Sequence, residues 1–182
     1  MPQQPQQSTT PAVGAPGPYP ATAPAGQDFG ERAFVARALE GDLSEIELDQ
    51  LALQKSQSND VKQLAQKLAS DHTQMDEKWF KPVAKQLGVS EPKGPSKKVK
   101  KVVAKLEGLS GPDFDTQYLT IMLKDHQQDL KEFKEEANSA QDPNVKQVAE
   151  QGANIISQHL QLIEQIAKNH NVAVDEKQKP SM

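Results

Sequence analysis

The chain has 182 residues, a formal net charge of −4 and no cysteine. The slightly acidic balance gives no reason to expect nucleic acid as a partner. The absence of cysteine excludes disulfides, thiolate metal sites and cysteine catalysis. No apolar stretch approaches the roughly 18 residues that a membrane-spanning helix needs, so we expect no transmembrane segment.

Residues 1–27 differ in composition from the rest of the chain. They contain no charged residue and hold seven of the thirteen prolines, among many Gln and Ala residues. Such a segment has too few apolar side chains to offset the entropy cost of ordering it, so we expect a disordered tail. The tail lacks the basic start and apolar run of a signal peptide, but its composition is typical of the segment just after a signal peptide in an exported protein. We therefore expect a periplasmic or secreted protein whose signal peptide has been removed, with Met1 added to a truncated mature sequence.

Four long helices are predicted after the tail, because apolar residues recur there at spacings of three and four. The first runs from about residue 28 to 56. The second begins at the capping pair Asn59-Asp60 and ends at Gly88. Pro82 lies inside it and is expected to kink or shorten the helix.

The second half of the chain contains the other two helices. A connection over residues 88–112 is itself predicted to be helical from 96 to 106, and Ser110 then introduces the third helix. Asp142 followed by Pro143 predicts the start of the fourth, because an acidic cap and a proline at the first helical position both favour a helix start.

A sequence repeat relates the two halves. The segment Asp60–Ala65, Asp-Val-Lys-Gln-Leu-Ala, recurs as Asn144–Ala149, Asn-Val-Lys-Gln-Val-Ala. Two copies of a helical hairpin joined by one long crossover are typical of a ferritin-like bundle. We therefore predict an all-α, ferritin-like four-helix bundle over residues 28–170, followed by a C-terminal tail over 171–182.

The inward faces of these helices carry mostly apolar residues. On the second helix the stripe includes Met75, Trp79 and Val83, and on the fourth it includes Ile155 and Leu162. A continuous apolar stripe faces the core of a bundle, so we expect these side chains to be buried.

Three of the four histidines interrupt the stripes near the centres of their helices. His72 lies on the second helix, His126 on the third and His159 on the fourth, and Glu45 occupies the matching position on the first. Central inward positions of the four helices of a bundle meet at one level. Three random histidines would all land on inward stripes in about one case in twelve. The remaining histidine, His170, is expected to be solvated at the end of the last helix.

This layer has the composition of a metal site. The predicted ligands are Glu45, His72, His126 and His159. Zinc, iron, manganese or copper accepts three imidazoles and a carboxylate. Asp71 and Asp125 each precede a histidine and are candidate extra ligands, or acceptors that orient the imidazoles. The alternative is a metal-free polar network in which Glu45 accepts hydrogen bonds from the histidines.

Other motifs point less specifically to a function. The crossover helix carries a basic run of Lys97, Lys98, Lys100, Lys101 and Lys105. This face is either simply solvated or contacts an anionic surface. The sequence shows no glycine-rich phosphate loop, no Ser-His-Asp arrangement and no Glu-x-x-His pair of the kind that di-iron proteins use. We therefore favour a binding protein over an enzyme.

Several of these segments resemble the DUF4142 family. They are the run Phe34–Leu48 with Leu51-Ala52, Val61-Lys62 leading to Asp71-His72, Phe114-Asp115 and Tyr118 leading to Asp125-His126, and Gln158-His159-Leu160. The resemblance covers about residues 28–169 and implies a ferritin-like fold. It also implies a bacterial protein that is exported, since most members are exported and some are labelled as outer-membrane proteins. The family has no established biochemical function, so the resemblance implies no reaction.

Three functions remain open from the sequence. The first is an exported ferritin-like bundle that binds a transition metal, as a metal-linked stress or envelope protein. The second is a metal-free envelope interaction module, in which an exposed helix face or the segment 97–105 contacts a protein or surface partner. The third is an oxidase with a dinuclear centre, which ranks last because the ligand pairs are missing.

Overall fold

The structure is a computed structural model, and it describes residues 28–174. The predicted N-terminal tail, residues 1–27, lies outside the described residues. Of the predicted C-terminal tail, residues 171–174 follow the last helix without joining it, and residues 175–182 lie outside the described part.

The described residues form helices and connections, with no strand among them. In chain order the helices are α1 (Asp28–Lys55), α2 (Asn59–Met75), the π-helix η1 (Asp76–Phe80), α3 (Lys81–Leu87), α4 (Lys97–Glu107), α5 (Gly111–Ser139) and α6 (Pro143–Asn169). The all-α prediction is confirmed, and each predicted helix boundary lies within one or two residues of the observed one. No helix among the described residues is long and apolar enough to cross a membrane.

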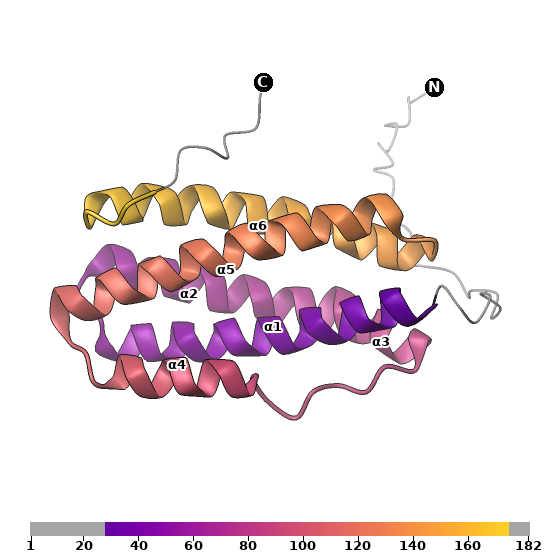
Figure 1. Ribbon diagram of the computed structural model, residues 1–182, viewed down its shortest axis with the longest axis horizontal. Helices are drawn as coiled ribbons and strands as arrows, with labels where there is room; N and C mark the ends of the chain where they lie inside the picture. Colours follow the sequence, from indigo (N-terminus) through magenta and orange to yellow (C-terminus); the bar gives the residue numbers. More distant parts are fainter. Residues whose placement is uncertain (1–27, 175–182) are drawn as a thin grey trace, which may run out of the picture.

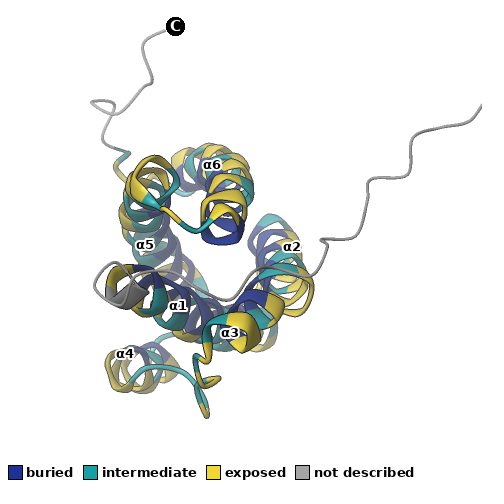
Figure 2. Ribbon diagram, turned by 90° about the vertical axis from the view of Figure 1, so that its right-hand side faces the viewer, coloured by how far each residue is buried: buried dark blue, intermediate teal, exposed yellow. Residues whose placement is uncertain are grey.

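The long helices form a bundle of two hairpins (Figures 1 and 2). α1 packs against α2, and α5 packs against α6. The hairpins meet along two further seams, α1 with α5 and α2 with α6, so the buried faces of all four helices turn toward one axis. The crossover helix α4 lies outside the bundle, against α1 and the neighbouring part of α5. This is the predicted ferritin-like arrangement, with its long and partly helical crossover.

The signals at Asp142 and Gly88 act as the sequence indicated, whereas the predicted capping pair Asn59-Asp60 lies inside α2, whose N-cap position is Ser58 and has no side-chain cap hydrogen bond. The Asp142 side chain accepts hydrogen bonds from the backbone N–H groups of Asn144 and Val145, which caps α6. Gly88 ends α3 with φ of 65°, a left-handed conformation that costs glycine little because it has no Cβ. These caps satisfy backbone groups that a helix end otherwise leaves without partners.

The segment before Pro82 departs from regular α-helix. η1 is a π-helix, in which the backbone N–H of Lys81 bonds to the carbonyl of Asp76, five residues back. The wider turn shifts the inward stripe by one residue, since a π-helix places more residues in each turn. The prediction that Trp79 belongs to the buried stripe is therefore wrong: Trp79 is half-buried, and Phe80 is fully buried in its place.

Two positions of the α6 stripe are also displaced by one residue from the prediction, whereas Val145, Val148 and Ile166 are buried as predicted. Ile155 and Leu162 are half-buried, whereas Ile156 and Ile163 are buried. Gly152 is a further core position of α6 that apolar spacing alone does not mark. It is buried because the Phe133 ring of α5 packs directly on its backbone.

The apolar core is divided into two parts by the level of the histidines. One part, toward the α1–α2 turn, contains Leu48, Leu64, Leu68, Phe114, Tyr118, Met122 and Ile163. The other contains Phe34, Met75, Phe80, Phe133, Val145 and Ile156, with edge-to-face rings of Phe34, Phe80 and Phe133 at centroid distances of 5.0–6.3 Å. Apolar side chains therefore cover the polar layer from both ends of the bundle.

Gly152→Ala is expected to destabilise the fold. An added Cβ would overlap the Phe133 ring, which the rings of Phe34 and Phe80 hold in place. Overpacking a rigid core costs about 1–3 kcal/mol, which exceeds the gain of up to about 1 kcal/mol from helix propensity. Urea denaturation measures the free energy of unfolding. Gly30→Ala is the control, because its Cβ would meet nothing within 4 Å. A Gly152→Ala variant as stable as the wild type would contradict this account of the α5–α6 contact.

Candidate metal centre

The structure brings the four predicted ligand residues together, one from each long helix. Glu45 comes from α1, His72 from α2, His126 from α5 and His159 from α6. Their exposed fractions are 4%, 2%, 0% and 0%, respectively, so all four are withdrawn from solvent. The reason is geometric: each lies on an inward stripe, with His72 in the last turn of α2, which η1 and α3 continue to Leu87, and the other three near the middle of their helices.

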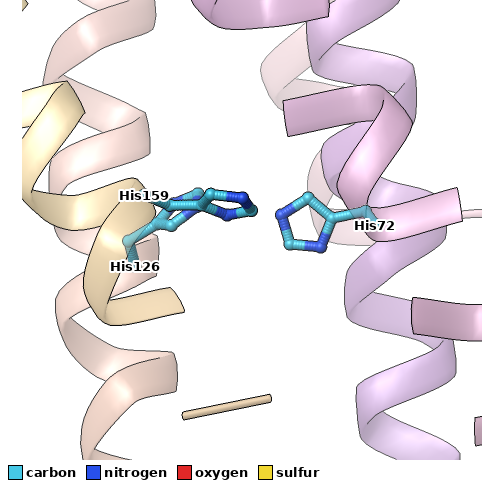
Figure 3. Close-up of side chains that lie close together, drawn as sticks. All are labelled: His72, His126 and His159. Atoms are coloured by element: carbon cyan, nitrogen blue, oxygen red, sulfur yellow. The ribbon is translucent and has the colours of Figure 1, made fainter. Parts of the chain in front are cut away.

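The three imidazole rings face one another across the axis of the bundle. His126 and His159 project from neighbouring helices, and His72 approaches from the opposite side (Figure 3). Their ring centroids are 5.2–5.7 Å apart. Each ring offers one nitrogen that lies within 4.8 Å of the other two, so the three histidines could hold a metal ion. Such atoms fit within about 2.8 Å of a common point, and small ring movements reach the bond length of about 2.0–2.1 Å for zinc and imidazole.

One nitrogen of each ring is engaged by an acceptor on the outside of the cluster. Nδ1 of His72 lies 2.7 Å from Oδ1 of Asp42. Nδ1 of His126 lies 3.0 Å from the backbone carbonyl of Met122, one turn earlier in α5. Nε2 of His159 lies 2.8 Å from Oδ2 of Asp71. In each case the acceptor fixes the ring orientation and places the N–H on the outer nitrogen.

The opposite nitrogen of each ring is buried and has no hydrogen-bond partner. These atoms are Nε2 of His72, Nε2 of His126 and Nδ1 of His159. Both carboxylate oxygens of Glu45 are also buried without a hydrogen bond. Oε2 of Glu45 lies 2.6 Å from Nε2 of His72, and Oε1 lies 3.5 Å from Nδ1 of His126. These are ion-pair distances, and the contact with Glu45 contributes to the raised pKa of His72.

The electrostatics of the cluster keep two of its rings neutral. Burial, reinforced by the charge of His72, lowers the pKa of His159 to about 4. Burial also lowers the pKa of His126, although Glu45 opposes the shift. Burial would likewise lower the pKa of His72, but the carboxylates of Glu45 and Asp42 outweigh it and raise that pKa well above 6.5. Metal ions bind the neutral form of imidazole, which His126 and His159 already have at pH 7.

Glu45 stays ionised in this setting. Burial alone would raise the pKa of its carboxyl group, but the positive charge that His126, His72 and His159 carry when protonated lowers that pKa to about 2. The centre therefore presents a carboxylate and two neutral imidazoles at neutral pH. A proton on His72 is the one that a metal ion would displace.

Of the two predicted supporting aspartates, only Asp71 engages a histidine. Asp71 does not reach its neighbour in sequence, His72; it accepts from His159 across the α2–α6 seam and from Lys67 of its own helix. Asp125 is half-buried, and no hydrogen bond joins it to a histidine. Its burial and the charge of Glu45 raise the pKa of its carboxyl group.

Three acidic residues near the centre were not predicted from the sequence. Asp42 is 5% exposed and accepts a hydrogen bond from His72. Burial and then the contact with Asp42 raise the pKa of Asp76, in the π-helix, to about 9. Burial and then the charge of Glu45 raise the pKa of Asp129 to about 8. The sequence did contain a signal for these three aspartates, because each lies three or four residues from a predicted ligand and therefore one helical turn away on the same face.

His170 lies far from the centre in sequence and takes no part in it. The expectation that it is solvated is wrong: its side chain is 20% exposed, and its Nε2 contacts Asp60 at 3.1 Å. The turn after α6 folds back against the start of α2, which brings the two residues together.

Comparison with known proteins identifies the family. The family model described as a domain of unknown function, DUF4142, matches residues 15–166. The chain belongs to the DUF4142 family. The resemblance seen in its Asp-His segments is thereby confirmed. No protein among the curated sequences matches it.

Solved structures of a differently named family share the fold of this DUF4142 protein. A DUF305 fragment from Deinococcus radiodurans superposes with a TM-score of 0.66 at 18% identity, covering 76% of this chain and 95% of that one. A "putative secreted protein DUF305" from Streptomyces coelicolor superposes with a TM-score of 0.66 at 13% identity, covering 82% and 98%. At these identities the likeness shows the fold alone.

His159→Gln is expected to make the free energy of unfolding of the metal-free protein depend less on pH between about 6.5 and 4. Between pH 6.5 and about 4 the unfolded chain protonates His159 but the folded chain does not. This group therefore makes the free energy of unfolding fall as the pH drops through that window, by at most about 1.4 kcal/mol per pH unit. Urea unfolding of both proteins at several pH values, with a chelator present, measures the difference in slope.

Comparing the variant with the wild type removes the contribution of ionisable groups whose effect on the pH dependence of stability is opposite to that of His159. The raised pKa values of Asp76 and Asp129 make stability fall as the pH rises, and both residues are present in wild type and variant. His170→Gln, outside the cluster, is the matched control. Parallel profiles for wild type and His159→Gln would show that His159 is protonated in the folded protein.

Proposed function

We propose that this protein binds one transition metal ion in the core of its bundle. The proposed ligands are Glu45, His72, His126 and His159. The observation that carries the proposal is the orientation of the three rings. One nitrogen of each ring is engaged by an acceptor, while the opposite nitrogens of His126 and His159 are buried without a partner and that of His72 contacts Glu45. Imidazoles that ligate metals characteristically donate their other N–H to a carboxylate or a backbone carbonyl.

A metal-free polar network accounts less well for these atoms. Buried polar groups in folded proteins nearly always have partners, and each unsatisfied one costs about 1–3 kcal/mol. Here Nε2 of His126 and Nδ1 of His159 have no partner, and the Glu45 oxygens contact only ring nitrogens of His72 and His126. A cation at their centre would satisfy all of them at once, whereas rearranged hydrogen bonds among fixed rings would leave some without partners.

The donor set selects the class of ion. Imidazole and carboxylate donors suit zinc, iron, manganese or copper, and hard ions that prefer all-oxygen sites fit poorly. When bound, such an ion would supply positive charge and Lewis acidity. The chain itself holds two rings neutral, keeps Glu45 ionised and fixes the orientation of every ring. These are properties of a site that retains an ion, so we propose metal binding and storage or sensing in preference to catalysis.

We further propose that the protein acts outside the cytoplasm. Two observations support this: the resemblance to a family of mostly exported bacterial proteins, and the name "secreted" carried by the structural neighbour from Streptomyces coelicolor. The dinuclear oxidase remains the least favoured function, because no Glu-x-x-His pair is present in the sequence.

Metal content tests the proposed site directly. Protein purified without a histidine tag and supplied separately with zinc, iron, manganese and copper is expected to retain about one equivalent of at least one ion. His72→Ala/His126→Ala should lose it while circular dichroism shows an intact helical fold. His170→Ala is the matched control and should retain it. Absence of bound metal from the wild type under every condition would refute the proposal.

Asp42→Asn separates an orienting role from a ligand role. Asp42 contacts the outer nitrogen of His72, so the substitution leaves all four proposed ligands in place. We expect the stoichiometry to persist and the affinity to fall by about 10–100-fold, as for other groups that orient metal-bound histidines. Isothermal titration calorimetry with the metal that the wild type retains measures both quantities. An unchanged affinity would show that Asp42 does not orient the site.

A second candidate function rests on α4. Lys97, Lys98, Lys100, Lys101 and Lys105 are all exposed, and none forms an ion pair among the described residues. The helix is held to the bundle through Val99 and Leu106, so the lysines project from its outer side. Such a basic face favours an anionic membrane surface, to which each lysine contributes about 1 kcal/mol.

Vesicle binding tests this second candidate. The wild type is expected to sediment with anionic phospholipid vesicles at low salt and to be released at high salt. Replacing the five α4 lysines by Gln should abolish binding, and replacing Lys124, Lys131 and Lys134, which are on α5, should have a smaller effect. Equal binding to neutral vesicles, or binding that survives the α4 substitutions, would rule out this surface.

A further inference from the structure

A small pocket leads from the surface toward the histidine cluster along the α1–α5 seam. Its volume is about 30 Å³, the space of roughly one water molecule. Asp42 and His72 line its inner part, and Arg37, Gly41 and Glu132 line its outer part. The pocket therefore joins solvent to one of the proposed metal ligands.

The inner part of the pocket is lined by two carboxyl groups. Oδ1 of Asp42 is engaged by His72, while its Oδ2 is buried and has no hydrogen bond. Asp129 lines the same pocket from α5 and lies within electrostatic range of Asp42 and Glu45. Two carboxyl groups in succession offer oxygen atoms to a cation on its way between solvent and the cluster.

Gly41 leaves the outer part of the pocket open. It lies within α1, where glycine costs about 1 kcal/mol relative to alanine. A Cβ at this position would meet nothing within 4 Å, so packing does not require a glycine. Gly41 follows Arg37 by one turn on the same side of α1, the side that faces Glu132 of α5. The missing side chain thus leaves space where the pocket reaches the surface.

An ion pair spans the mouth of the pocket. Nη2 and Nε of Arg37 lie 2.5 and 2.6 Å from Oε1 of Glu132, which links α1 to α5. The Arg37 side chain is 56% exposed and that of Glu132 is 30% exposed, so the pair is in contact with solvent. Exposed ion pairs contribute little stability and exchange partners readily, so an incoming cation can replace Arg37 at Glu132.

We propose that this pocket is the route by which the metal ion enters and leaves the core, from Glu132 past Asp129 and Asp42 to His72. Arg37 closes the mouth, and Gly41 keeps the passage wide enough for an ion. The proposal rests on the metal-binding function above, and it adds the pathway and the residues that control the rate of exchange.

The rate of metal uptake tests the route separately from the site. Stopped-flow absorbance of the metal-free protein mixed with Co²⁺ gives the association rate, and transfer of bound Co²⁺ to excess chelator gives the dissociation rate. Gly41→Val is expected to lower both rates by at least about tenfold, corresponding to about 1.4 kcal/mol on the barrier, with a nearly unchanged dissociation constant. Arg37→Gln is expected to raise both rates. Gly30→Val, in the same helix but away from the pocket, is the matched control.

The outcomes distinguish the route from the function. If the wild type binds Co²⁺ and Gly41→Val exchanges it as fast as the wild type, the route is wrong and the metal site stands. If the wild type binds no Co²⁺ and no other ion, the proposed function itself fails. Gly41→Ala, which narrows the pocket less and favours the helix, provides a second variant with an intermediate rate should Gly41→Val fold poorly.

Discussion

The structure depends on how the bundle keeps ionisable side chains inside its core. Burial of a polar or charged group without a partner is costly, and Glu45 and the three central histidines are at most 4% exposed. Hydrogen bonds from the outside of the layer offset part of that cost and fix each ring. The inner nitrogens of His126 and His159 remain without partners, and a cation would supply the missing interaction. Metal binding is therefore expected to be linked to stability.

The helices are shaped around this layer. The π-helix of residues 76–80 turns Asp76 toward Asp42, which in turn holds His72, so a departure from α-geometry supports the orientation of a proposed ligand. π-helical turns are frequent at functional sites, where the extra residue redirects a side chain. The same turn buries Phe80 against Phe34 and Phe133, which covers the layer on one side.

The enclosure of the Glu45 and histidine layer limits the size of any ligand that can reach it. Apolar clusters lie on both sides along the bundle axis, and the pocket beside His72 has room for roughly a water molecule or an ion. Such a centre suits the retention of an ion, because a larger substrate would have to separate α1 from α5. The exposed lysines of α4 lie on the outside of the bundle, so contact with an anionic surface would leave the core undisturbed.

The sequence by itself determined the helices, the caps at Asp142 and Gly88, the hairpin repeat and the four central residues Glu45, His72, His126 and His159. These depend on periodicity and local capping chemistry, which act within a few residues. Only the tertiary structure decided that Asp71 bonds to His159 instead of His72, that Asp42 orients His72, and that Phe80 replaces Trp79 in the core. Hydrogen bonds between helices depend on their relative rotation and register. Packing across the whole bundle sets both, and no local pattern encodes them.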